Sequence, residues 1–340
     1  MLNKTITIGG TDIAPGTQQL VDLPVGSLYT HTEMHLPVHV IHGKTEGPRL
    51  FISAAIHGDE LNGLEIVRRL LRLKSIKRIK GTLIAVPFVN GFGLLQNSRY
   101  LPDRRDLNRC FPGSERGSLA SRIAHIFLNQ IVQQCDYGID IHTGAIHRSN
   151  LPQIRANLDE PETKKLAEAF GVPVIINANL RDGSLRAAAD EFRVKTLLYE
   201  AGQALRLDEL SVRAGVKGIQ NVMRELGMLS SKSHRNANTE PYIARSSSWI
   251  RAPHSGLLQS YKKLGDRVSK NQVLAAVTDP SDMFDLHEHE ILSKYAGIII
   301  GKTNIPLVNE GDAIFHVARF EDAGDVEAEL DNFEQNTLID

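Results

Sequence analysis

The sequence predicts an α/β fold in which a mostly parallel, mixed sheet is flanked by helices and followed by a second, smaller all-β domain, a barrel or sandwich. Strand-like apolar runs alternate with helical patterns over about 200 residues, and such alternation produces parallel sheets covered on both faces. After residue 255 this alternation gives way to an internal repeat of short strands with matching Gly-Asp turns, which indicates the all-β part.

The composition is that of a globular protein with a large core, and it argues against several kinds of partner. The chain has 340 residues, of which 41% are hydrophobic, and its formal net charge is -1. So small a charge gives no general attraction to nucleic acid or anionic membranes, and no apolar run approaches the ~18 residues of a membrane span. The amino terminus lacks the apolar core of a signal peptide, and Cys110 and Cys135 alone do not suggest a disulfide framework. We therefore expect a cytoplasmic protein with a small-molecule partner; a homo-oligomer is left open.

The first strand-loop-helix unit places candidate ligands at the end of a strand. The apolar run that begins at Phe51 stops at His57, and helical spacing begins after Glu60, with apolar residues at Leu61, Leu64, Val67, Leu70 and Leu71. Ligands of open α/β sheets bind outside the carboxyl ends of the strands, where His57 lies. An imidazole and a carboxylate on either side of a turn that contains Gly58 can bind one cation, and zinc suits this mixture. Alone, the pair is a weak signal because so short a pattern arises by chance.

A third candidate ligand, His142, strengthens this interpretation because it also ends a strand-like segment. Two histidines and one carboxylate are the protein ligands of a catalytic zinc site whose fourth position is open to water. Asp140 precedes His142 by two residues, so both side chains leave the strand on the same face. The Asp140 carboxylate can then accept the other ring N–H, as metal-bound histidines usually require.

The histidines of the amino-terminal part are interpreted as structural. Residues 1–35 contain short extended pieces compatible with a hairpin, and residues 36–42 alternate like a strand. Histidines that share a strand face are separated by an even number of residues, and no carboxylate is interleaved in this strand. We therefore do not expect a metal site among the histidines of this tract, which are His31, His35, His39 and His42.

The next segment leads into a long irregular loop. The basic cluster at residues 74–80 falls at a helix end, where the dipole favours cations, so we do not interpret it as a nucleic-acid site. Residues 81–89 predict a strand and residues 90–93 a turn. The irregular segment over residues 94–117 is long for a compact domain, and such segments are often functional.

This loop carries side chains suited to a carboxylate. Arg109 presents a planar fork of donors and Asn108 adds an amide donor, so the pair could hold a substrate carboxylate. Alternatively, the arginine pairs with Asp103 or Asp106 and stabilises the loop. The spacing does not separate these two interpretations.

The remaining part of the first domain alternates helices and strands. Helices are predicted over residues 118–134, 160–170 and 185–191, and strands over residues 137–142, 172–178 and 194–199. The last strand leads into Glu200, whose carboxylate would reach the same sheet edge as His57 and His142, within range of a metal-bound water. An ordinary strand-end glutamate that faces solvent is the other interpretation, and the residue by itself favours it.

The domain boundaries follow from composition. A polar run over residues 230–240 indicates a linker, and the repeated Gly-Asp turns come after it. We predict a first domain over residues 1–235, a β domain over residues 236–325 and an acidic tail over residues 326–340.

Four motifs in this order resemble the succinylglutamate desuccinylase/aspartoacylase family, which has the zinc carboxypeptidase-like fold. They are His-Gly-Asp-Glu at 57–60, Asp-Leu-Asn-Arg at 106–109, Asp-Ile-His-Thr-Gly at 140–144 and Tyr-Glu-Ala-Gly at 199–202. The resemblance covers residues 36–205, and the ordered set is far more specific than any single motif. It implies the following roles: His57, Glu60 and His142 as ligands of one zinc ion, Glu200 as general base, and Asn108 and Arg109 as substrate-carboxylate ligands.

Two further arginines match the family by type. Arg99 would polarise the scissile carbonyl, but its distance in sequence from Asn108 looks longer than in the family, so that Arg104 or Arg105 could take its place. Arg186 resembles a second substrate-binding arginine ahead of the base.

The carboxyl-terminal repeat is similar to a biotinyl or lipoyl carrier domain, as in several bacterial members of the family. A carrier needs a lysine in the hairpin between the two halves. Residues 279–290 contain none, so we do not expect covalent cofactor attachment.

The motifs and the resemblance together imply zinc-assisted hydrolysis of an amide bond in a small N-acyl amino acid or related acyl amide that bears a carboxylate. Zinc would lower the pKa of a bound water toward 7, and Glu200 would take its proton and return it to the leaving amine. One alternative is a zinc carboxypeptidase that releases the terminal amino acid of a peptide. Another is a non-catalytic binding module, against which the complete set of ligand and base positions argues.

Overall fold

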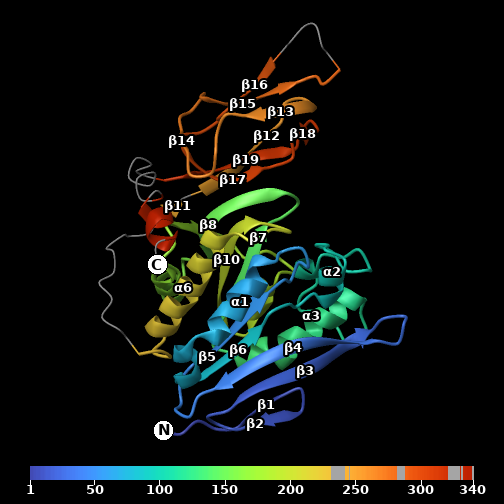
Figure 1. Cartoon of the computed structure of the whole chain (residues 1–340), viewed down its shortest axis with the longest axis vertical. Helices are drawn as coiled ribbons and strands as arrows, with labels where there is room; N and C mark the ends of the chain where they lie inside the picture. The colour runs from blue at the N-terminus through green and yellow to red at the C-terminus, as the bar shows by residue number, and fades with distance from the viewer. Residues whose placement is uncertain (231–241, 245, 282–287, 321–329, 331, 339–340) are drawn as a thin grey trace.

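A computed structural model gives the structure of the chain and describes residues 1–230, 242–244, 246–281, 288–320, 330 and 332–338. The structure is built on one large mixed sheet flanked by helices, and the later strands lie at one end of the molecule (Figure 1). This confirms the predicted α/β class. No helix in the described part of the chain has the length and hydropathy needed to cross a bilayer.

The four central strands are parallel and coincide with the apolar runs of the sequence. In spatial order they are β10 (Lys195–Gln203), β7 (Tyr137–Gly144), β5 (Arg49–Ala54) and β6 (Thr82–Val86). Every residue of β6 is buried because the sheet is covered on both faces.

Antiparallel strands extend the four parallel strands on both sides of the sheet. The predicted parallel arrangement therefore holds for these four central strands, and the sheet as a whole is mixed. On one side β4 (Glu33–His42) pairs with β6, and β3 (Gln18–Ser27) pairs with β4. On the other side β8 (Arg148–Ala156) pairs with β10. The connection from β7 to β8 is only residues 145–147, and so short a connection cannot form the crossover that parallel strands require.

Three small strands complete this part. β9 (Val174–Asn177) pairs in parallel with β8. β1 (Ile6–Ile8) and β2 (Thr11–Ile13) form a separate antiparallel hairpin at the amino terminus, in agreement with the expected hairpin.

Helices cover both faces of the large sheet, and each face has its own apolar core. On one face lie α1 (Asn62–Arg72), α4 (Pro161–Phe170) and α6 (Glu209–Glu225), and on the other α3 (Leu119–Gln130) and α5 (Leu185–Glu191). Ile139 and Ile141 of β7 pack in the apolar core beneath α1, α4 and α6, here called the α1 core. Because side chains alternate along a strand, Asp140 and His142 point to the opposite face, which α3 and α5 cover.

The connecting segments contain short helices. The turn predicted at residues 90–93 is wrong: these residues begin α2 (Gly91–Leu95), because the Asn90 side chain accepts a hydrogen bond from the Gly93 N–H at 2.7 Å and caps the helix. Single turns of 3₁₀ helix form η1 (Lys74–Arg78), η2 (Leu107–Arg109) and η3 (Val132–Gln134).

The described residues after the linker form strands in two sheets. β12 (Ser246–Arg251), β19 (Ala313–Arg319), β17 (Gly297–Thr303) and β14 (Arg267–Val268) extend the large sheet, and β11 (Tyr242–Ala244) pairs with β9. The second sheet contains β16 (Glu288–Leu292), β15 (Val273–Thr278), β13 (Gly256–Ser260) and β18 (Leu307–Val308). An apolar cluster that includes Leu274, Ile299 and Ile314 is shared by strands of both sheets.

The internal repeat is visible in two matching turns. In the first, the Lys263 N–H donates to the Asp266 carboxylate at 3.0 Å, and in the second the Asn309 N–H donates to the Asp312 carboxylate at 2.8 Å. The glycine before each aspartate has a positive φ, +87° and +86°, which favours glycine over any other residue. The predicted pair of Gly-Asp turns is therefore confirmed.

Three of the sequence predictions lie outside the described residues. They are the linker, with the boundary at residue 235, the centre of the hairpin at residues 282–287, and the boundary of the acidic tail at residue 325. In the acidic tail, residues 332–338 are helical and Phe333 packs against the α1 core.

The start of α6 provides a test of the fold. The Asp208 carboxylate accepts a hydrogen bond from the Ser211 N–H at 2.7 Å and caps this helix. We expect Asp208→Ala to lower the free energy of unfolding by about 0.5–2 kcal/mol, because an N–H at the helix start loses its acceptor. Urea unfolding followed by circular dichroism measures this change. Asp208→Asn keeps an acceptor and should remain near the native value; an equal loss in both variants would contradict the capping role.

Candidate metal centre

Three predicted ligands meet at the carboxyl edge of the central strands. His57 and Glu60 lie in the loop between β5 and α1, and His142 lies in β7. One ligand atom from each lies within 4.8 Å of the other two, and the side chains are only 3%, 1% and 5% exposed. Among the described residues, this is the one group of three or more histidine, cysteine or carboxylate side chains placed to hold a metal ion.

The backbone after β5 is shaped to turn the loop back toward the sheet. Ala55 has φ +45°, an uncommon conformation for a residue with a side chain. Gly58 approaches α2 so closely that a Cβ atom would lie 2.0 Å from the carbonyl carbon of Gly93. These two residues allow His57 and Glu60 to face the same point.

The Glu60 carboxylate lies between the two imidazoles. Its Oε1 is 2.8 Å from His57 Nδ1, and its Oε2 is 2.9 Å from His142 Nδ1. Each imidazole presents its other nitrogen to a second carboxylate: His57 Nε2 is 3.1 Å from Asp106, and His142 Nε2 is 2.7 Å from Asp140. Both Nδ1 atoms therefore point to the centre of the cluster, in the orientation that metal-ligating histidines need.

The electrostatics of the cluster favour a cation. Burial alone would raise the pKa of Glu60, but the positive charges of His57 and His142 and their hydrogen bonds hold it well below its usual range. Burial would lower the pKa of His142, but Asp140 and Glu60 outweigh burial and raise it well above its usual value. Three carboxylates thus surround two imidazoles. Two nitrogen ligands and one carboxylate in a buried site fit zinc, so the donor set agrees with the predicted metal.

Glu200 lies beside this cluster, on the neighbouring strand. In β10 it is directly paired with His142 of β7, so both side chains leave the same face of the sheet. Its Oε1 accepts a hydrogen bond from Asn150 Nδ2 at 2.7 Å, and its Oε2 forms an ion pair with Arg155 Nε at 2.6 Å. The side chain is 19% exposed, so it is not the solvent-facing glutamate of the alternative interpretation.

Arg99 reaches the cluster from the long loop. Its NH1 group is 3.2 Å from His57 Nδ1 and 3.4 Å from Glu60, and its fork contacts Asp106 at 2.9 and 3.2 Å. Arg104 and Arg105, the alternatives to Arg99, are exposed. Arg99 is therefore the arginine of this loop that the structure brings to the ligands.

The predicted substrate-binding residues have different surroundings. Asn108 is buried and its side-chain oxygen accepts a hydrogen bond from the Leu185 N–H at 2.9 Å. Arg186 is also buried and donates to the Ala178 carbonyl at 2.8 Å, and burial lowers its pKa to about 10.

Arg109 is exposed and lies near other positive charges. Its guanidinium donates to the Asn108 carbonyl. Partial burial lowers the pKa of this guanidinium, the charges of Arg181 and Arg99 act in the same direction, and the negative charge of Asp106 opposes them. Repulsion among these guanidinium groups is relieved by an anion, so this surface suits a carboxylate.

Sequence reasoning missed three residues that contact the site. Asp106 was considered only as a partner that stabilises the loop, yet it contacts both His57 and Arg99. Its position at the start of the Asp-Leu-Asn-Arg motif was the available signal. No sequence pattern pointed to Asn150 or Arg155 as contacts of the site, because the strand that carries them, β8, was not predicted.

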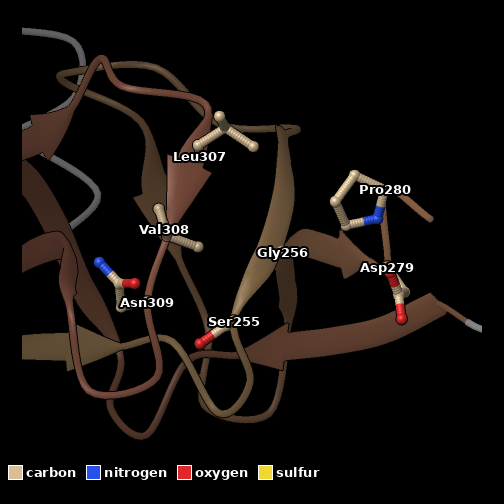
Figure 2. Close-up of a pocket in the computed structure, with 7 residues that line it drawn as sticks. All are labelled: Ser255, Gly256, Asp279, Pro280, Leu307, Val308 and Asn309. Carbon is tan, nitrogen blue, oxygen red and sulfur yellow. The ribbon is translucent and has the colours of Figure 1, made fainter.

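Two other features have no part in this centre. His42, the last histidine of the amino-terminal tract, is buried between Thr82 Oγ1 at 2.9 Å and the Lys4 carbonyl at 2.7 Å, in agreement with a structural role. Figure 2 shows a pocket at the ends of β13 and β18, where Asp279 is the one carboxylate among the described lining residues. These described lining residues include no histidine or cysteine.

Comparisons with known proteins agree with the site. A model of the succinylglutamate desuccinylase/aspartoacylase catalytic domain matches residues 46–226, slightly more than half of the chain. An N-alpha-acetyl-L-2,4-diaminobutyric acid deacetylase of Halomonas elongata is 28% identical over 293 residues, which cover 83% of this chain and 85% of that protein.

Solved structures of similar proteins share most of the fold. A succinylglutamate desuccinylase/aspartoacylase from Rhodobacter sphaeroides superposes with a TM-score of 0.79 at 25% identity, covering 89% of this chain and 95% of that one. The product-bound ectoine utilization protein EutE (DoeB) from Ruegeria pomeroyi gives a TM-score of 0.79 at 25% identity, with 89% and 94% covered. Because the family's catalytic-domain model matches more than half of its length, the chain belongs to the succinylglutamate desuccinylase/aspartoacylase family, as its four ordered motifs predicted.

Proposed function

We propose that the chain is a zinc-dependent hydrolase that cleaves the amide bond of a small N-acyl amino acid or related acyl amide. The observation that carries this proposal is the buried group of His57, Glu60 and His142 with Glu200 on the adjacent strand. Membership of the family supports the reaction class, and the similarity to a deacetylase of an N-acetylated amino acid supports the substrate class.

His57, Glu60 and His142 are the residues that would hold zinc. When bound there, zinc supplies Lewis-acid chemistry, which lowers the pKa of water and polarises a carbonyl. Asp106 and Asp140 orient the two imidazoles by accepting their other ring N–H groups.

Glu200 is the proton carrier of the proposed reaction. Its carboxylate takes a proton from the attacking water and returns it to the nitrogen of the leaving amine, which completes hydrolysis without a change in the net proton count. The contacts from Asn150 and Arg155 restrain its two oxygens while it does so.

Positively charged groups position the substrate. Arg99 lies beside the ligands and stabilises negative charge that develops on the carbonyl oxygen. Arg109 binds the substrate carboxylate at the exposed side of the site, and Asn108 and Arg186 order the surrounding backbone through their hydrogen bonds. This arrangement selects acyl amides that carry a carboxylate.

A panel of N-acetyl amino acids, N-succinyl amino acids and peptides, assayed with the zinc-loaded protein, tests the substrate class. We expect release of the free acid and the free amino acid from N-acyl amino acids. Release of terminal amino acids from peptides, with no cleavage of N-acyl amino acids, would instead identify a carboxypeptidase.

The native protein should contain about one tightly bound zinc ion per chain. His57→Ala, Glu60→Ala and His142→Ala each remove a ligand and should release the ion, as measured by metal analysis after dialysis. His35→Ala, in the structural histidine tract, is the matched control and should retain zinc. Retention of zinc by all three ligand variants would exclude this site.

Glu200→Gln should lower kcat by about 10²-fold to 10⁴-fold on a substrate that the native protein cleaves, because the amide keeps the shape but cannot accept the proton. Zinc content and thermal unfolding should remain native. Loss of zinc in this variant would make Glu200 a ligand, and near-native turnover would show that another group is the base.

A further inference from the structure

The β domain is joined to the catalytic strands next to Glu200. β8 pairs with β10 on one edge and with β17 of the β domain on the other, so one sheet runs through both parts (Figure 1). Asn150 stands at this junction: it is paired with Gly202 of β10 and with Gly301 of β17. A residue in this place can transmit the position of the β domain to the active site.

Asn150 and Arg155 hold the two oxygens of Glu200 from the same strand. Asn150 Nδ2 donates to Oε1 at 2.7 Å, and Arg155 Nε lies 2.6 Å from Oε2 in an ion pair. Asn150 is only 6% exposed, so water has little access to replace its hydrogen bond. A carboxylate that moves a proton needs a defined orientation, and these contacts supply it.

Gly301 provides the space in which Asn150 sits. A Cβ atom at this position would lie 2.7 Å from Asn150 Oδ1, 3.2 Å from the Cβ of His316 and 3.5 Å from the Trp249 ring. The φ of Gly301 is not in the positive range, so its backbone conformation does not require glycine. The absence of a side chain is therefore explained by the close approach of Asn150.

His316 and Trp249, in the β domain, pack beside Gly301. Their rings stack with centroids 4.6 Å apart and an interplanar angle of 12°. His316 is 4% exposed, and burial, together with the charge of Arg155, lowers its pKa to about 3. The imidazole is therefore neutral at neutral pH.

We propose that Asn150 is a positioning residue for Glu200, and that the β domain holds it in place through the close contact at Gly301. This inference rests on the proposed role of Glu200 as base. It assigns the β domain a part in catalysis that does not need a carrier lysine.

Asn150→Ala tests the first step. Because the hydrogen bond orients the base and does not bind substrate, kcat should fall by about 10-fold to 10²-fold while KM and zinc content stay native. Ser149→Ala is the matched control, since Ser149 Oγ contacts Asn304 instead of Glu200, and it should retain native kcat. Native kcat in Asn150→Ala, or a change confined to KM, would overturn the proposal.

Gly301→Ala tests the contribution of the β domain through a double-mutant cycle. The new methyl group should displace Asn150 and lower kcat, but it should cause no further decrease in the Asn150→Ala background, where the displaced group is absent. Lys302→Ala, at the next position of β17, is the control and should leave kcat native. Additive losses in the double variant would show that Gly301 acts through general stability and would overturn the coupling.

The Glu200→Gln background separates this inference from the proposed function. If Glu200 is the base and Asn150 acts through it, Asn150→Ala should not slow Glu200→Gln further. Near-native turnover of Glu200→Gln would refute the role of Glu200 as base in the proposed function, and with it this inference. A slow Glu200→Gln combined with a fast Asn150→Ala would refute only the positioning role.

Discussion

The site depends on one buried carboxylate placed between two imidazoles. Removing an ionised group from water is costly unless the group is paired and hydrogen-bonded, and Glu60 meets this requirement with His57 on one oxygen and His142 on the other. Asp106 and Asp140 in turn hold the outer nitrogens of the two imidazoles. Each imidazole is thus held on both sides, so the three candidate ligands, from one loop and one strand, keep one mutual orientation suited to a single cation.

Strand geometry brings these groups together. Parallel strands end at the same edge of a sheet, and alternation puts Asp140 and His142 on one face of β7 while Ile139 and Ile141 pack in the opposite core. The same register places Glu200 of β10 beside His142. The carboxylate proposed as base therefore shares a face with His142, a proposed metal ligand, without having to be a ligand itself.

The mixed character of the sheet gives the β domain its position. Because β8 returns antiparallel after a short connection, its far edge remains available, and β17 pairs with that edge. Strands of the all-β part thus continue the large sheet that carries the candidate site. Two polar side chains of β8, Asn150 and Arg155, contact Glu200, and Asn150 is itself paired with β17 at this junction.

The sequence by itself identified the three candidate ligands that the structure brings together, because the His-x-x-Glu loop and the Asp-x-His pair are local patterns whose geometry follows from one turn or one strand. It also determined the central strands, whose apolar runs are continuous. It did not reveal β8, where Asn150, Pro152 and Gln153 interrupt any regular apolar alternation, or the partners of Asp106, which lies in an irregular loop. Only the tertiary structure decided which side chains hold Glu200, because strand pairing between segments distant in sequence brings them together, and local spacing carries no information about that pairing.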